Sequence, residues 1–187
     1  MGDSGKTATH TLRNPSLELT MTRRTDALAD TLLQGANDLA DLAATLTDAE
    51  WQVRVPRDGR TVGVIVHHVA TMYPLEIELA QAVASGKAII GVTWQAVHDI
   101  NAAHARDHAG TTREEAIALL RRNSELAAQA IRAFADEDLD RSAPISLYFD
   151  TPLTSQFFLE DHAVRHSWHH TARIRQALAE QPAVAAA

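Results

Sequence analysis

A histidine-rich stretch near the C-terminal end is the strongest chemical signal in the sequence. His162, His166, His169 and His170 lie within nine residues of one another. In an α-helix, residues four apart lie on the same face, so His166 and His170 share one stripe. That stripe is otherwise apolar and also carries Leu159, Ala163, Ile174 and Ala177. Buried imidazoles need a partner for their nitrogens, and a metal ion is the first candidate.

A second segment carries another histidine on its apolar seam. In residues 61–85, the positions that step by three and four residues are Ile65, His68, Met72, Leu75 and Leu79. This spacing is typical of a helix that packs in a bundle. His67 falls on a different stripe, so we expect only His68 of this adjacent pair to face the interior.

The seam positions predict one metal site formed by His68, His166 and His170. Facing helices of a bundle can direct ligands into their shared core. Zinc binds neutral imidazole nitrogens, and catalytic zinc typically has three protein ligands and one open position. The residues alone leave an alternative open, in which the three histidines are half-buried and bonded to carbonyl groups or to one another.

The remaining histidines carry weaker signals. His104 and His108 are also four apart, but their charged and glycine-rich neighbourhood is typical of a solvated helix end, so we expect both to be exposed. For His162 and His169 we favour exposed positions over a role in orienting the ligands.

Apolar periodicity predicts an all-α protein. Helical spacing or capping signals define segments near 25–46, 61–85, 94–108, 112–134 and 154–178. Four of these are long and one is shorter, and we find no convincing strand. The prediction is a four-helix bundle with one additional short helix. We expect one domain over residues 21–180, a flexible N-terminal arm over 1–20 and a tail over 181–187.

Composition excludes several classes of function. The 187 residues carry a net charge of −7, and no basic stripe is available to track a phosphate backbone, so we expect no nucleic-acid partner. No apolar run suggests a signal core or a membrane span, so we expect a cytoplasmic protein without a membrane partner. The chain has no cysteine, so any thiol chemistry must use a thiol from outside. We expect a small-molecule substrate and leave a homodimer open.

Two motifs resemble the DinB/YfiT-like superfamily. They are Thr61 to Ala70 (TVGVIVHHVA) and Val164 to His170 (VRHSWHH). The segments around Asn101 to Ala105 and Thr112 to Glu115 are similar to actinobacterial-type members, so the resemblance covers about residues 21–180. It implies a four-helix bundle holding a divalent metal, often zinc or nickel, on His68, His166 and His170.

The same superfamily includes the metal-binding domain of mycothiol-dependent maleylpyruvate isomerase and the bacillithiol and mycothiol S-transferases. The chain departs from many members after the last ligand, where Thr171-Ala172-Arg173 replaces Arg-Gly-Gln. It also has histidine at position 166, where isomerase-type members have glutamate, and we expect it to be without the isomerase's C-terminal domain. We therefore do not expect this chain to make the contacts that other members make after the last ligand. We also do not expect it to have the isomerase activity.

The resemblance implies a metal-dependent S-transferase that uses a low-molecular-weight thiol cosubstrate on a small electrophile. A divalent cation would stabilise the thiolate that a cysteine-free chain cannot supply. The same ion could activate water, so a metal-dependent hydrolase is an alternative. A non-catalytic metal-containing protein that binds small molecules or serves in a stress response is another, because a bundle can host many functions.

Overall fold

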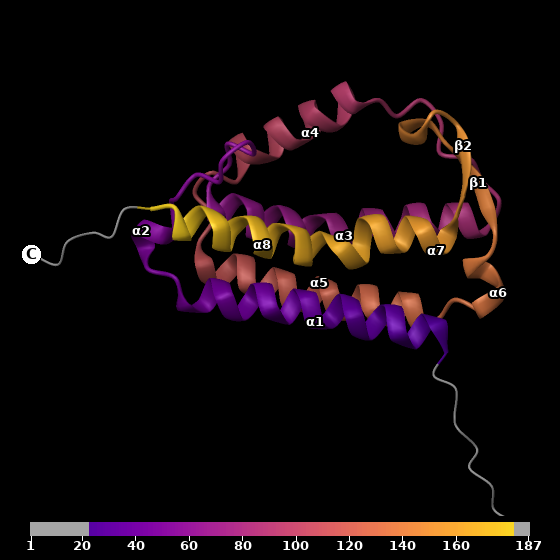
Figure 1. The fold of residues 1–187 in the computed structure, drawn as a ribbon, viewed down its shortest axis with the longest axis horizontal. Helices are drawn as coiled ribbons and strands as arrows, with labels where there is room; N and C mark the ends of the chain where they lie inside the picture. The colour runs from indigo at the N-terminus through magenta and orange to yellow at the C-terminus, as the bar shows by residue number, and fades with distance from the viewer. Residues whose placement is uncertain (1–22, 182–187) are drawn as a thin grey trace, which may run out of the picture.

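The computed structural model describes residues 23–181, and its four long helical stretches form the predicted bundle. In Figure 1, α1 and α5 lie along one side of the bundle and α3 and α8 along the other. α3 and α5 run in one direction, and α1 and α8 run in the opposite one. The long helical elements are α1 (Arg24–Thr45), α3 (Val62–Ala84), α5 (Arg113–Arg132) and α8 (Arg165–Ala179).

The parallel pair α3 and α5 requires a crossover, and α4 (Trp94–Asp107) supplies it. This helix runs back over the outside of the bundle from the end of α3 toward the start of α5 (Figure 1). α4 contributes no fully buried residue. The predicted additional short helix is therefore a connection that covers the bundle without entering its core.

Capping boxes begin two of the helices. The Thr47 hydroxyl and the Glu50 carboxylate cap the short α2 (Asp48–Trp51) reciprocally, and Thr112 and Glu115 do the same for α5. Trp51 then packs against Gly63, where a built Cβ would lie 2.5 Å from the indole. The absence of a side chain at residue 63 therefore lets the indole pack against the first turn of α3.

The expectation that no strand is present was wrong. After α6 (Asp136–Leu139), the chain forms an antiparallel hairpin of β1 (Ser142–Ile145) and β2 (Thr151–Thr154), joined through a 3-10 turn (Ser146–Tyr148). The sequence hid this hairpin because the strands are short and Pro144 pairs with Pro152. Proline is tolerated because a two-stranded sheet has only edge strands. The segment after α3 contacts the hairpin through Ile89, whose backbone forms hydrogen bonds with the backbone of Pro144 and Ser146.

The predicted last helix is interrupted. It consists of α7 (Ser155–Phe158), a π-helical segment (Leu159–Val164) and α8. A π segment inserts about one extra residue into the helical repeat. Leu159, Ala163, His170, Ile174 and Ala177 are nevertheless buried, so the predicted stripe still faces the core.

The predicted N-terminal arm and nearly all of the predicted C-terminal tail lie outside the described residues. Within residues 23–181, no helix combines the length and apolar character needed to cross a membrane.

Candidate metal centre

α3 and α8 bring the three predicted ligands together. A nitrogen atom from each of His68, His166 and His170 lies within 4.8 Å of a nitrogen from each of the others. The ring centroids are 5.1 Å apart for His68 and His166, 5.8 Å for His68 and His170, and 5.1 Å for His166 and His170. His68 and His170 are each 6% exposed. Three imidazoles thus converge at the interior face of two neighbouring helices.

The buried nitrogens of this cluster fit a cation. Nδ1 of His170 is buried without a hydrogen-bond partner. Burial, followed by the neighbouring His166, lowers the pKa of His68 far below its usual range. The same causes lower the pKa of His170 to about 2. The rings are therefore neutral near pH 7 and keep a lone pair for a metal, which is the state that zinc and nickel bind.

Glu76 is a functional candidate that the sequence interpretation missed. Its side chain is almost completely buried, and its Oε1 lies 2.7 Å from Nδ1 of His166. A carboxylate beside Nδ1 favours the tautomer that leaves Nε2 free as a ligand atom. The available signal was spacing, because Glu76 lies eight residues after His68 and hence near the same helix face.

Arg60 contributes a positive charge near the cluster. It forms two contacts with the carboxylate of Asp58, at 2.6 and 2.9 Å. Burial acts to raise the pKa of Asp58, but the hydrogen bond and charge of Arg60 outweigh it and the pKa is lowered. The guanidinium also contributes to the low pKa values of His68 and His170. The Arg60 guanidinium therefore opposes protonation of both histidines, while the Asp58 carboxylate acts in the opposite direction on His170.

The cluster lies at an apolar pocket of about 310 Å³. α3, α4, the hairpin and α7 provide the apolar walls, and Trp94 and Tyr148 are the aromatic side chains with a polar group in this lining. The apolar wall consists mainly of Met72, Leu75, Leu79, Ile89, Val97, Ile100, Ile145, Leu147 and Phe158. Such a pocket suits a small molecule with a largely apolar body.

His162 belongs to a small polar network beside this pocket. Tyr148 donates a hydrogen bond to Oδ2 of Asp161, and its hydroxyl lies 3.2 Å from Nε2 of His162. Burial and the Asp161 carboxylate raise the pKa of Tyr148, so the phenol keeps its proton at neutral pH. His162 is half-buried, contrary to the exposed position expected for it, because it stacks on Phe158 at 4.2 Å between ring centroids.

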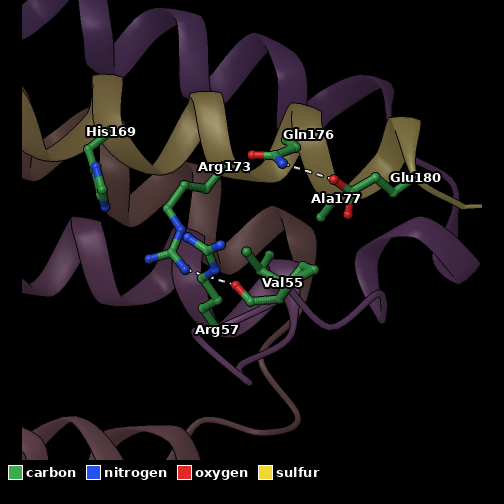
Figure 2. Close-up of a pocket in the computed structure, with 8 residues that line it drawn as sticks. Val55, Arg57, His169, Arg173, Gln176, Ala177 and Glu180 are labelled. Carbon is green, nitrogen blue, oxygen red and sulfur yellow. Dashed lines mark hydrogen bonds between the residues drawn. The ribbon is translucent and has the colours of Figure 1, made fainter.

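His169 is exposed, as favoured from the sequence, and it lines both the apolar pocket and a neighbouring groove of about 650 Å³. Figure 2 shows this groove, with Arg57 and Arg173 close together below α8. Arg173 donates a hydrogen bond of 2.8 Å to the carbonyl of Pro56. Two guanidinium groups and one carboxylate, from Glu180, thus line a groove that shares His169 with the apolar pocket.

The other histidine cluster was not expected. His67 lies off the seam, as predicted, but it is only 9% exposed because the end of α4 covers it. His104 and His108 are half-buried against it, so their predicted solvated positions were wrong. Burial lowers the pKa of His104 to about 4. Local sequence could not reveal this contact, because it depends on the path of the crossover helix.

Comparison with known proteins identifies related folds. The family model described as the DinB superfamily matches residues 31–174. YfiT from Bacillus subtilis, described as a probable metal-dependent hydrolase with an unusual four-helix bundle topology, superposes with a TM-score of 0.66 at 19% identity, covering 82% of this chain and 85% of that one.

Two further solved structures share the fold. A sibling lethal factor precursor, DfsB, has a TM-score of 0.66 at 18% identity, covering 84% of this chain and 98% of its own. The colibactin self-resistance protein ClbS, in complex with a double-stranded DNA, has a TM-score of 0.63 at 15% identity. The match covers 87% of this chain and 99% of ClbS. No curated protein matches the sequence.

Proposed function

This chain belongs to the DinB superfamily, and on that premise we propose that it is a metal-dependent enzyme that transfers a low-molecular-weight thiol to a small, largely apolar electrophile. The observation that carries the proposal is the cluster of His68, His166 and His170 at the apolar pocket. Three imidazole donors in this arrangement suit a zinc or nickel ion. When bound there, such an ion acts as a Lewis acid and lowers the pKa of a thiol or water beside it.

The pocket supports an external nucleophile. Its lining contains no serine, threonine, cysteine or lysine side chain. Ser167 and Thr171, the hydroxyl residues adjacent to His166 and His170 in sequence, are both buried, and the Ser167 hydroxyl lies 2.6 Å from the hydroxyl of Tyr73. A side chain held in this way is not available to attack a substrate. The attacking group is therefore a cosubstrate, either a thiol or water.

The groove in Figure 2 supports the choice of a thiol that carries polar or anionic groups. Arg57 and Arg173 can hold a carboxylate, while His169 connects this groove with the apolar pocket. In the transfer, the thiol proton is released to solvent and the sulfur forms a bond to the electrophilic carbon. The leaving group departs with its bonding electron pair. The apolar wall positions the electrophile and excludes water.

A metal-dependent hydrolase is the second candidate. The observation that favours it is the shared fold with YfiT, which is described as a probable metal-dependent hydrolase. In that reaction, water would replace the thiol as nucleophile. A non-catalytic protein that binds a small molecule is the third candidate, and it predicts binding without turnover.

One assay separates these candidates. The metal-free protein is loaded with Zn²⁺ or Ni²⁺ and mixed with an aromatic halide and each of a panel of low-molecular-weight thiols. We expect metal-dependent loss of thiol together with halide release, both abolished by chelator and by His170→Ala. The exposed His98→Ala on α4 is the matched control and should keep the activity. Ester or amide hydrolysis without thiol would instead establish the hydrolase, and binding without either reaction would overturn both enzymatic proposals.

A further inference from the structure

The His67, His104 and His108 cluster has the donor set of a metal site in its own right. A nitrogen atom from each residue lies within 4.8 Å of a nitrogen from each of the other two. The rings lie 4.0 Å apart for His67 and His108, 4.6 Å for His104 and His108, and 5.1 Å for His67 and His104. His104 lies on α4, His108 is the C-cap residue of that helix four positions later, and His67 comes from the facing α3.

The hydrogen bonds within this cluster leave imidazole nitrogens that could bind a metal ion. Nδ1 of His67 lies 2.9 Å from Nε2 of His104, and the Thr71 hydroxyl lies 3.3 Å from the same Nε2. Nδ1 of His104 is buried without a partner. Two nitrogens bound tetrahedrally to zinc lie about 3.4 Å apart, so small ring rotations would convert the observed contact into joint ligation.

This cluster opens to a different part of the surface from the first. His67 and His108 line a groove of about 660 Å³ between the end of α4 and the start of α5. Asp107 and Glu115 line the same groove and favour a cation, while Arg122 opposes it. Neither His68 nor His170 lines this groove. A cation can therefore reach the second cluster without passing through the apolar pocket.

We propose that His67, His104 and His108 form a second divalent-cation site that fastens α4 to α3. Imidazole donors select a zinc-like ion such as Zn²⁺, Co²⁺ or Ni²⁺ over Mg²⁺ or Ca²⁺. α4 packs only weakly on the bundle, because it buries no residue completely and its Trp94 and Ile100 remain more than half exposed. A cation at the end of this helix would hold the wall of the apolar pocket that α4 provides.

Metal stoichiometry tests the second site independently of any catalytic activity. Untagged protein is stripped with chelator, saturated with Co²⁺, freed of excess ion by gel filtration and analysed for metal by mass spectrometry. We expect two ions per chain in the unmodified protein and in His98→Ala. We expect one ion in His104→Ala, in His108→Ala and in His170→Ala, and none in the double variant His108→Ala/His170→Ala.

The outcome that overturns the site is a single ion in the unmodified protein that His104→Ala and His108→Ala both retain. Because these two side chains are half-buried on a helix without a buried residue, we expect both variants to fold, which circular dichroism checks. Hydrogen exchange gives a second measure. Co²⁺ should slow amide exchange in α4 of His170→Ala but not of His108→Ala, and equal protection in the two variants would also refute the site.

Discussion

His68, His166 and His170 are useful probes at the scale of single residues because each contributes one imidazole ring to the same cluster. We expect replacement of any one by alanine to remove most of the cation bound at the apolar pocket, since two imidazoles leave the ion with too few protein ligands. Co²⁺ absorption titrations of the three variants check this. His98→Ala, which changes an exposed histidine, should match the unmodified protein. Unchanged binding in all three variants would exclude this cluster as the metal centre.

Glu76 should matter through His166 and not through direct ligation. We expect Glu76→Gln to weaken metal binding by about 10- to 100-fold, because the amide removes the negative charge that lies beside Nδ1 of His166. Competition with a chelator of known affinity measures the change. Glu78→Gln makes the same chemical change at an exposed position on the same helix and should have no effect. Similar affinities for the two variants would contradict an orienting role for Glu76.

The low pKa values of the buried histidines predict loss of stability in acid. Folding lowers the pKa of His68 and His170 below the ordinary value of about 6.5. Below that value, His68 and His170 bind protons in the unfolded chain but remain unprotonated in the folded chain. The stability contribution is therefore complete above about pH 6.5 and declines as the pH falls, toward about 2 for His170. The charged or titratable groups near these rings are Asp58, Arg60, Glu76, His104, His166 and His169.

Thermal unfolding of metal-free and Zn²⁺-loaded protein from about pH 8 to about pH 5 tests this linkage. We expect the melting temperature of the metal-free protein to fall with pH, because burial and the neighbouring His166 and Arg60 lower the pKa values of His68 and His170 without any metal. The stabilisation by Zn²⁺ should also shrink, since protons compete for the same nitrogens. A metal-free melting temperature that stays constant in this range would refute the first expectation. A constant gap between the two samples would refute the second.

At the scale of elements, the contact between α2 and α3 depends on Gly63. We expect Gly63→Ala to lower the free energy of unfolding by about 1 to 3 kcal/mol, because the new Cβ would overlap the buried indole of Trp51. The energetic cost of this overlap should exceed the stability that alanine gains over glycine within a helix. Urea unfolding measures the change. Gly110→Ala is the control, since a Cβ there meets no atom within 4 Å. Equal stability of the two variants would show that the indole can move at little cost.

At the scale of the whole molecule, charge predicts no affinity for nucleic acid. The net charge of −7 opposes binding to a phosphate backbone, although the structurally similar ClbS was solved with a double-stranded DNA. We expect no binding of a double-stranded oligonucleotide at about 150 mM salt, measured by fluorescence anisotropy with and without Zn²⁺. Salt-dependent binding at micromolar protein concentration would contradict this expectation.

The sequence by itself predicted the helices of the bundle and which histidines lie on their apolar seams, because both depend on local periodicity. A helix places residues three and four apart on one face, so Ile65, His68 and Met72 defined a seam, and His166 with His170 defined another. The sequence missed the hairpin at Pro144 and Pro152 because those prolines suppress the usual strand signal. It missed the π-helical segment because one inserted residue leaves the apolar pattern readable on both sides.

Only the tertiary structure decided which distant side chains meet. The contact of His67 with His104 and His108 exists because α4 crosses back over α3, a path that helical spacing within either segment does not specify. The burial of Glu76 beside His166 likewise depends on how α3 and α8 pack. Periodicity states which face of a helix is buried. The relative position of two helices depends on packing and connections between segments far apart in the chain.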